Sequence, residues 1–375
     1  MLKIIAIIWS ASIIYQLISA FCSRAFKKRL KEAKKIKRFP KVLLLKPLCG
    51  IDKDFFENIL SFLRIPYPGY KLLLGVAKRD DPAYKLAKKI KDLFPDKVIL
   101  TEGEAKEGSN RKVRNLMNME RHIPQSSEII ILSDSDTKAE PSYIEKMIIP
   151  ILEDSSAGAT TAIYRIEGRH CIADLIEILN VEANFIPAVL FSAFFTGYSL
   201  RYAFGASIAI RRDVLEKIGG FSSVKDYLAD DYMLAKLIVQ KGYKVILAPY
   251  IVKITSEGKG IKEAFLKVLR WNRTVKTCNP FGYFFTFLCH PTPWALILYL
   301  ITGEIFLLLF TVLLRIICGL EVLRSIDSDK KICIFTPFGD FLFLFLWLIS
   351  FLGKEVFWRG KRYRVYSDGR MEEIG

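Results

Sequence analysis

The sequence predicts an α/β domain with a mostly parallel β-sheet, placed between an N-terminal transmembrane helix and C-terminal transmembrane helices. Apolar residues make up 51% of the 375 residues, more than an ordinary soluble domain contains. Short β-rich runs alternate with helical patterns from Pro40 to Tyr250, and long apolar runs follow Phe281. We therefore expect an anchor at 1–23, an α/β domain at 40–278 and a membrane-associated part at 279–375.

An apolar stretch from Ile4 to Phe21 opens the chain, and a basic run follows it. Arg24–Arg38 holds nine Lys or Arg and one Glu. A cleaved signal peptide carries its positive charge before the apolar core, whereas only Lys3 precedes this one. The order favours a retained anchor with its N-terminus outside and its basic flank against anionic lipid on the cytoplasmic side. Because the basic residues cluster beside apolar runs, the net charge of +17 does not indicate nucleic-acid binding.

Five β-rich runs in the central part are separated by segments of helical length. They are Lys41–Lys46, Tyr70–Ala77, Lys97–Thr101, Glu128–Ser133 and Ala157–Tyr164. This alternation predicts a parallel sheet with crossover helices, and ligands of such sheets bind at the carboxyl ends of the strands. The seven cysteines form no CxxC pair, which favours reduced thiols over a disulfide framework or a zinc site.

Two apolar segments near the C-terminus predict membrane crossings. Trp294–Leu314 has 21 residues, about the length that a bilayer core requires, and Ile334–Gly353 is the second candidate. Glu304 falls in the middle of the first segment, where we expect it to face the bundle interior or to be protonated. The aromatic segment Phe281–Pro293 is expected to lie in the interface or to re-enter the membrane.

The charges around these segments predict their orientation. Gly319–Cys333 carries three basic and three acidic residues, whereas Lys354–Arg364 carries five basic and one acidic residue. The positive-inside rule then places the neutral link outside and the basic tail in the cytoplasm. We accordingly expect a multi-pass membrane protein with its α/β domain on the cytoplasmic face.

The sequence Asp134-Ser135-Asp136 follows a strand of buried character. Asp134 and Asp136 would point to the same side of an extended segment, where they could share a divalent cation. Mg²⁺ and Mn²⁺ prefer such oxygen ligands and complete their shell with water and phosphates. This pattern fits a nucleotide-sugar site, and a solvated turn is the alternative.

Two further candidates fall near strand ends and helix starts. Asp80 or Asp81 would be presented after the strand ending at Ala77, where a carboxylate can hold a base or ribose; a turn that opens the next helix is the alternative. Lys112 and Asn115 follow a glycine turn and could contact a diphosphate and a nucleotide-sugar. A solvated basic helix explains them equally well.

Two later motifs suggest acid–base and charge-stabilising chemistry. Asp230 and Asp231 open a helix, where one could cap the helix and one could deprotonate an acceptor hydroxyl. Lys267 and Arg270 fall three apart on one helix face and could neutralise a departing diphosphate, with Trp271 stacking on a sugar or acceptor. A basic helix on the membrane surface is the alternative.

Taken in order, these motifs resemble the D, D, D, (Q/R)xxRW pattern of family 2 glycosyltransferases. The resemblance is closer to the ceramide glucosyltransferase family, also called family 21, and extends from about Val42 to the C-terminus. It rests on six segments: Leu45–Asp52, Tyr67–Leu74, Asp80–Pro82, Lys112–Leu116, Gly205–Gly220 and Trp358–Ile374.

This resemblance implies a GT-A-type domain, a UDP-sugar donor, a divalent cation (Mg²⁺ or Mn²⁺) and inverting transfer, most simply of glucose, to a lipid hydroxyl at the cytoplasmic membrane face. By the same resemblance Asp134 is the metal-site aspartate and Asp231 the catalytic base. Arg270 and Trp271 end the RW motif.

Three positions depart from the family pattern. Lys267 replaces Gln or Arg and lacks their planar group, Asp230 replaces Glu, and Asn184–Pro187 lacks the His-Pro expected of the animal enzymes. The acceptor is therefore open between ceramide and a hopanoid lipid, the latter with N-acetylglucosamine or a related sugar. The remaining alternatives are a processive polysaccharide synthase, which would need a transmembrane channel, and a non-catalytic sensor, against which the three acidic motifs argue.

Overall fold

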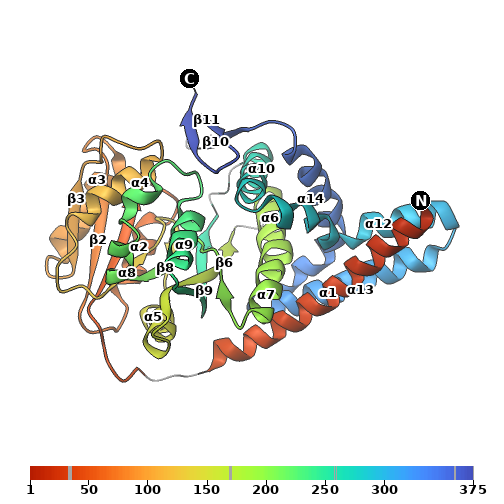
Figure 1. The fold of residues 1–375 in the computed structure, drawn as a ribbon, viewed down its shortest axis with the longest axis horizontal. Coiled ribbons are helices and arrows are strands. Elements are labelled where there is room, and N and C mark those ends of the chain that lie inside the picture. The colour runs from red at the N-terminus through yellow and green to blue at the C-terminus, as the bar shows by residue number, and fades with distance from the viewer. Residues whose placement is uncertain (33–35, 169–170, 257, 259, 359, 375) are drawn as a thin grey trace.

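The computed structural model describes residues 1–32, 36–168, 171–256, 258, 260–358 and 360–374. The predicted basic flank and the C-terminal motif therefore fall partly outside the described residues, at 33–35 and at 359. A nine-stranded sheet forms the centre of the α/β domain, and a group of long helices projects from one side of it (Figure 1).

The sheet has the strand order β3-β2-β1-β4-β8-β6-β9-β5, and β7 also pairs with β9. β1, β2, β3 and β4 run parallel to one another, whereas β8 is antiparallel to its neighbours β4 and β6. The five predicted strands are confirmed, with boundaries shifted by a few residues. The strands are β1 Val42–Leu48, β2 Tyr70–Val76, β3 Val98–Glu102, β4 Ile129–Leu132, β5 Thr137–Lys138, β6 Ala157–Glu167, β7 Ser199–Leu200, β8 Ile208–Arg211 and β9 Lys244–Thr255.

Helices cover both faces of the sheet. Because side chains alternate along a strand, Leu44 of β1 packs with α2, α3 and α5, whereas Leu43 and Leu45 pack with α4 and α9 on the other face. β1 is buried over its whole length, as expected for a central parallel strand. The elements of this domain are α2 Phe55–Leu63, α3 Pro82–Leu93, α4 Arg111–Glu120, α5 Tyr143–Glu153, α8 Arg212–Lys217, the 3₁₀ turn η2 Phe221–Val224 and α9 Asp230–Gln240.

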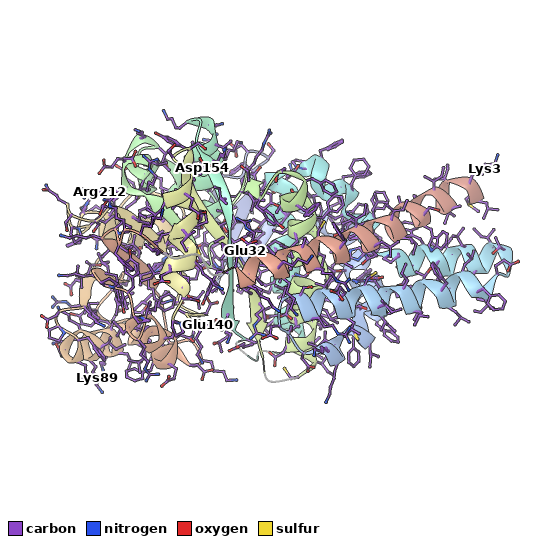
Figure 2. All side chains as sticks on the ribbon, turned by 90° about the horizontal axis from the view of Figure 1, so that it is seen from below. Lys3, Glu32, Lys89, Glu140, Asp154 and Arg212 are labelled. Carbon is purple, nitrogen blue, oxygen red and sulfur yellow. The ribbon has the colours of Figure 1, made fainter. Side chains whose placement is uncertain are left out.

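The projecting part is helical. Its long helix α1 runs from Lys3 at the far end to Glu32 beside the α/β domain (Figure 2), and α12 and α13 lie along it (Figure 1). The elements are α1 Leu2–Lys31, α6 Ile172–Asn180, the π-helix η1 Val181–Phe185, α7 Ile186–Phe195, α10 Ile261–Cys278, α11 Pro280–Phe284, the 3₁₀ turn η3 Phe285–Cys289, α12 Pro291–Thr302, α13 Ile305–Ser325, the 3₁₀ turn η4 Lys330–Phe335 and α14 Thr336–Ser350.

The surface of α1 has the reverse of a water-soluble pattern. Its polar residues Ser12 and Gln16 are buried, and Gln16 Nε2 donates to the backbone oxygen of Cys289 at 2.7 Å. Its apolar residues Ile7 and Leu17 are 68% and 50% exposed. A helix that turns its polar face inward and its apolar face outward suits lipid rather than water.

Four helical segments are long and apolar enough to cross a membrane, as judged over the part of the chain that the structure describes. A fifth results if the bent pair Pro280–Cys289 and Pro291–Thr302, with 57° between its parts, counts as one span. The four are Leu2–Lys31, Ile172–Phe195, Ile305–Ser325 and Lys330–Ser350.

The predicted single helix over Trp294–Leu314 is wrong. α12 ends at Thr302, and Gly303 takes a positive φ of 76° that reverses the chain into α13. This conformation favours glycine. Glu304 consequently lies exposed at the tip of a helical hairpin, not in the middle of a span.

The predicted placement of Gly319–Cys333 across the membrane from the α/β domain is also wrong. Arg165 of β6 donates a hydrogen bond to the backbone oxygen of Asp327, and Ser328 Oγ donates one to Glu182 of η1. Because these contacts tie the link to the α/β domain and its adjoining helix, the link and the domain lie on the same side. A charge count over a short link cannot anticipate such packing.

The tail after α14 is folded. It forms a second, antiparallel sheet with the order β10-β11-β12, in which Glu355 lies opposite Arg364 and Val365 opposite Met371. The bounds are β10 Glu355–Trp358, β11 Lys361–Val365 and β12 Met371–Glu373.

A buried ion pair joins the hairpin to the rest of the molecule. Arg315 of α13 lies 3.0 Å from Asp340 of α14 and is also 3.1 Å from Asn184 Oδ1. Because Asp340→Ala would leave the buried Arg315 charge uncompensated, we expect it to destabilise the fold by roughly 3–5 kcal/mol. Thermal unfolding in detergent measures this, with Glu304→Ala as an exposed acidic control. Equal melting temperatures for the two variants would contradict the prediction.

Candidate active site

The Asp134-Ser135-Asp136 loop lies at the carboxyl end of the parallel strands, as predicted. β4 ends at Leu132. Asp134 and Asp136 keep partial solvent access, whereas Ser135 between them is buried and donates a hydrogen bond of 2.7 Å to Asp52. The two carboxylates therefore share the accessible side of the loop, and the serine faces the protein.

A buried lysine supports this loop. Lys46 Nζ lies 2.7 Å from the backbone oxygen of Asp134 and 2.8 Å from Thr137 Oγ1. Its ammonium also lies 3.9 Å from the centre of the Phe62 ring. Burial lowers the pKa of Lys46 to about 7, although the carboxylates of Asp136 and Asp134 oppose the change. In the sequence, Lys46 stands out because it lies within the otherwise apolar strand β1. A lysine is rarely fully buried without partners.

Lys112 connects two of the predicted acidic motifs. It belongs to the first turn of α4, which Asn110 caps by accepting hydrogen bonds from the backbone of Lys112 and Val113. Its Nζ lies 2.8 Å from Asp134 Oδ1 and 3.2 Å from Asp230 Oδ2. Although burial lowers the pKa of Lys112, the surrounding carboxylates raise it well above its usual range. The predicted alternative of a solvated basic residue is therefore wrong for Lys112.

Asp231 lies beside this cluster in the first turn of α9. Its Oδ2 accepts a hydrogen bond from the backbone of Gly205 at 2.7 Å, and its Oδ1 accepts one from Tyr232 at 2.7 Å. Enclosure by protein raises the pKa of Asp231 to about 6, and repulsion from Asp230 adds to the increase, while Lys112 opposes it. A carboxylate with this pKa is ionised near neutral pH and is still able to accept a proton.

Asp134 and Asp136 provide oxygen ligands that fit a divalent cation. Burial raises the pKa of Asp136, and repulsion from Asp134 raises it further. In the described structure Asp136 Oδ1 is buried without a hydrogen-bond partner. A cation would relieve both conditions. No group of three or more His, Cys, Asp or Glu side chains forms a metal site among the described residues, so water and a phosphate would complete the shell.

Asp81 and Asn115, which were predicted to contact a nucleotide, form hydrogen bonds within the protein. Asp81 caps α3 by accepting from the backbone of Ala83, and it also accepts from Gly50 at 2.9 Å, so the capping alternative describes it. Asp80 is exposed. Asn115 donates from Nδ2 to the backbone oxygen of Gly75 at 2.9 Å. Their contacts to a nucleotide remain predictions.

The basic motif on α10 lies at the junction with the helical part. Lys267 Nζ is 2.8 Å from Glu177 of α6 and 5.2 Å from the centre of the Trp271 ring. Trp271 packs against the apolar cluster formed by α6, α7 and their neighbours. Glu177 therefore partly neutralises the charge of Lys267 before any ligand binds. This ion pair was not predicted from the sequence.

Tyr164 links this motif to the acidic cluster and was also missed. It lies on β6 and packs against Phe185 and Phe204, with ring centres 5.6 Å and 6.4 Å away. Burial raises the pKa of Tyr164, and the charges of Asp231 and Arg270 act on it in opposite directions. Asp231 and Arg270 thus share this tyrosine as a neighbour. Nothing in the sequence around Tyr164 distinguishes it from other strand tyrosines.

A comparison over nearly the whole chain decides the family. The model of Glycosyl transferase family 21 matches residues 4–371. The chain belongs to this family. It is therefore a glycosyltransferase, and the resemblance to ceramide glucosyltransferases is confirmed.

Two curated relatives of this family 21 glycosyltransferase come from Caenorhabditis elegans. Ceramide glucosyltransferase 1 is 24% identical over 363 residues, which cover 88% of this chain and 73% of the relative. Ceramide glucosyltransferase 3 is 24% identical over 236 residues, which cover 62% of this chain and 50% of the relative.

One solved structure resembles the family 21 chain over most of its length. It is a mannosyltransferase from Pyrobaculum calidifontis in complex with GDP-Man and Mn²⁺, and it superimposes with a TM-score of 0.56 at 18% identity. The match covers 93% of this chain and 97% of that one. The likeness shows the GT-A-like fold that the sequence predicted.

Gly205 is a further residue of the site, and the sequence marks it only as the glycine that opens the Gly205–Gly220 motif. A Cβ atom there would lie 3.2 Å from both Asp134 Oδ2 and Lys112 Nζ, and 3.4 Å from Asp231 Oδ2. We expect Gly205→Ala to lower turnover by roughly tenfold or more, because small displacements of catalytic groups are costly.

Steady-state kinetics and thermal unfolding together test this prediction. Gly50→Ala is not a suitable control, since Gly50 has a positive φ of 72°. Gly339→Ala adds a methyl group in α14, away from the acidic cluster, where the nearest atom, on Phe343, is 3.2 Å away. Activity of Gly205→Ala equal to that of Gly339→Ala would contradict the prediction.

Proposed function

We propose that this family 21 enzyme transfers a sugar, most simply glucose, from a UDP-sugar to the hydroxyl of a membrane lipid with inversion at the anomeric carbon. Ceramide is the first acceptor to test, because both C. elegans relatives are named ceramide glucosyltransferases. A hopanoid lipid is the second, because Asn184–Pro187 departs from the animal pattern.

One observation carries the proposal. Three chain segments far apart in sequence bring Lys112, Asp134 and Asp231 around the open side of Gly205. Lys112 would supply a positive charge for a diphosphate, Asp134 a carboxylate for a metal ion, and Asp231 a carboxylate that accepts a proton. All three lie around the same glycine. These are the groups that displacement of a nucleoside diphosphate by a hydroxyl requires.

Asp231 would act as the base of the transfer. In this step its carboxylate accepts the proton of the lipid hydroxyl, and the hydroxyl oxygen forms a bond to the anomeric carbon. The bond from that carbon to the UDP oxygen breaks, and UDP leaves with the electron pair. The hydrogen bonds from Gly205 and Tyr232 hold the carboxylate in place.

Cationic side chains would stabilise the departing diphosphate. Lys112 would exchange part of its pairing with Asp134 for the phosphates, and Arg270 and Lys267 would approach from α10. Asp134 and Asp136 would hold a divalent cation, which supplies further charge neutralisation when bound. The Mn²⁺ and GDP-Man in the mannosyltransferase complex support a cation and a nucleotide sugar as ligands of this fold.

The helical part would place the enzyme at the membrane. We propose that α1 anchors the chain and that the α12–α13 hairpin inserts beside it, with the α/β domain in the cytoplasm. The last turn of α1 carries Lys28, Arg29 and Lys31, which suit the anionic cytoplasmic surface. The active site would then face lipid hydroxyls at that surface.

The test is to incubate the purified protein with UDP-glucose or UDP-N-acetylglucosamine, Mg²⁺ or Mn²⁺, and ceramide, hopanoid or diacylglycerol acceptors. Mass spectrometry identifies the lipid product, and NMR of the anomeric proton reports inversion. A single added hexose supports the proposal. A polymer would indicate a processive synthase, and donor binding without any product from these acceptors would indicate a sensor.

A further inference from the structure

The C-terminal sheet and α10 border a half-open cavity of about 130 Å³. Three arginines line it, Arg270, Arg273 and Arg362, together with one acidic residue, Glu355, and apolar residues that include Phe357. The lining therefore combines three arginines with a mostly apolar surface, and it includes Arg270 of the RW motif.

Hydrogen bonds attach the C-terminal sheet to the rest of the protein on both sides of this cavity. On one side Arg273 donates to the backbone oxygens of Leu352, at 2.6 Å, and of Glu355. Arg273 thus holds the start of β10 against α10. The position of the sheet beside the RW motif is consequently set by specific hydrogen bonds.

On the other side the sheet pairs with the loop that precedes the acidic pair of α9. Met371 donates to the backbone oxygen of Asp226 at 2.8 Å, and Leu228 donates to that of Gly369 at 3.2 Å. Leu228 also packs into a small buried apolar cluster with Val356, Tyr363, Val365 and Met371. Two residues after Leu228, α9 begins with Asp230.

The same loop contacts the helix that carries Lys112. The backbone nitrogen of Asn110 donates to Lys225 at 2.8 Å, and its Nδ2 donates to the backbone oxygen of Tyr227 at 2.8 Å. Because Asn110 caps α4, the C-terminal sheet, Lys112 and the acidic pair are attached to one short segment, 225–228.

Arg362 is the residue through which the sheet would contact a ligand. In β11 the neighbours Tyr363 and Val365 are buried, so the alternating Arg362 and Arg364 point to the opposite, exposed side. Within the described residues no carboxylate forms an ion pair with Arg362. Planar guanidinium groups bind phosphate through two parallel hydrogen bonds.

We propose that Arg362 completes the donor site, so that the cavity between α10 and the C-terminal sheet binds a phosphate-type anion, the diphosphate of the nucleotide sugar. The inference rests on the proposed function, because it assumes a nucleoside diphosphate donor. The C-terminal sheet would then contribute a residue to the active site.

Calorimetric titration of UDP, in the presence of Mn²⁺, into the purified full-length protein tests this. We expect Arg362→Ala to weaken UDP binding roughly tenfold, as loss of a charge-assisted hydrogen bond predicts, and Arg362→Lys to weaken it less. Arg364→Ala is the matched control, since Arg364 lies on the same face of the same strand and does not line the cavity. We expect it to change the dissociation constant by less than about twofold. Thermal unfolding of each variant confirms that the sheet remains folded.

Equal UDP affinities for Arg362→Ala and Arg364→Ala would overturn this inference and leave the proposed function standing. A wild-type protein that binds no UDP would overturn both. A second arm measures binding to vesicles that contain anionic phospholipid. If Arg362→Ala loses vesicle binding and keeps its UDP affinity, the anion is a lipid head group and the donor assignment is wrong.

Discussion

Replacing Asp231 by Asn is expected to lower kcat by roughly 10²–10⁴-fold, the usual contribution of a positioned general base. The amide cannot accept the proton of the acceptor hydroxyl, yet it keeps the size of the carboxylate and one oxygen for the backbone nitrogen of Gly205. Donor binding should therefore remain. Turnover and UDP affinity of the purified variant are the two measurements.

The pH dependence gives an independent check on Asp231. The base acts in its ionised form, and its pKa is raised to about 6. Below that pH the carboxylate is protonated and inactive, so kcat/KM should fall about tenfold per pH unit, and above it kcat/KM should level off. The residual activity of Asp231→Asn should lack this change.

Asp92→Asn is the control for Asp231→Asn. Asp92 is exposed on α3, outside the acidic cluster, and its substitution should leave the kinetics unchanged. Full turnover by Asp231→Asn would remove the assignment of this residue as the base.

Replacing Asp134 by Asn is expected to reduce kcat/KM by about 10²-fold or more, because metal-held charge stabilisation is worth several kcal/mol. The variant should also need a higher Mn²⁺ concentration for half-maximal activity. Its Lys112 would lose a partner at 2.8 Å, so donor binding should weaken as well.

A comparison of Asp136→Asn with Asp134→Asn distinguishes the contributions of the two carboxylates. Burial and repulsion from Asp134 raise the pKa of Asp136, and replacing Asp136 by Asn removes this repulsion between the two side chains. We expect a smaller loss than for Asp134→Asn, since Asp134 forms an ion pair with Lys112 and Asp136 forms none with it among the described residues. An unchanged Mn²⁺ requirement in Asp134→Asn would show that the cation binds elsewhere.

The α/β domain was predictable because its signals are local. The strands β1 to β4 are short apolar runs, and the position of Asp134 at a strand end follows from parallel topology alone. The acidic pair at Asp230 and Asp231 was found in the same way, at a helix start. Their convergence on Lys112 was not predictable, because it depends on how three separate loops pack.

The helical part was predicted less well, for two physical reasons. Hydropathy is insensitive to a single residue such as Gly303, which splits one apolar run into two antiparallel helices. Charge counts describe a segment's affinity for lipid and not its hydrogen bonds, so they missed the attachment of Asp327 to β6. The tail was likewise predicted only as a basic cytoplasmic segment, although its alternating buried residues, Tyr363 and Val365, follow a strand pattern.

The buried pair of Arg315 and Asp340 has a consequence for how the enzyme would select lipids. It joins the hairpin, α14 and the segment around η1, since the Arg315 guanidinium also contacts Ala183 and Asn184. The distance of Asp231 from the bilayer surface would then be fixed by the fold. An acceptor would react only if its hydroxyl can reach Asp231. The depth of the hydroxyl in the membrane, and not its chemical identity alone, would then determine which lipids are substrates.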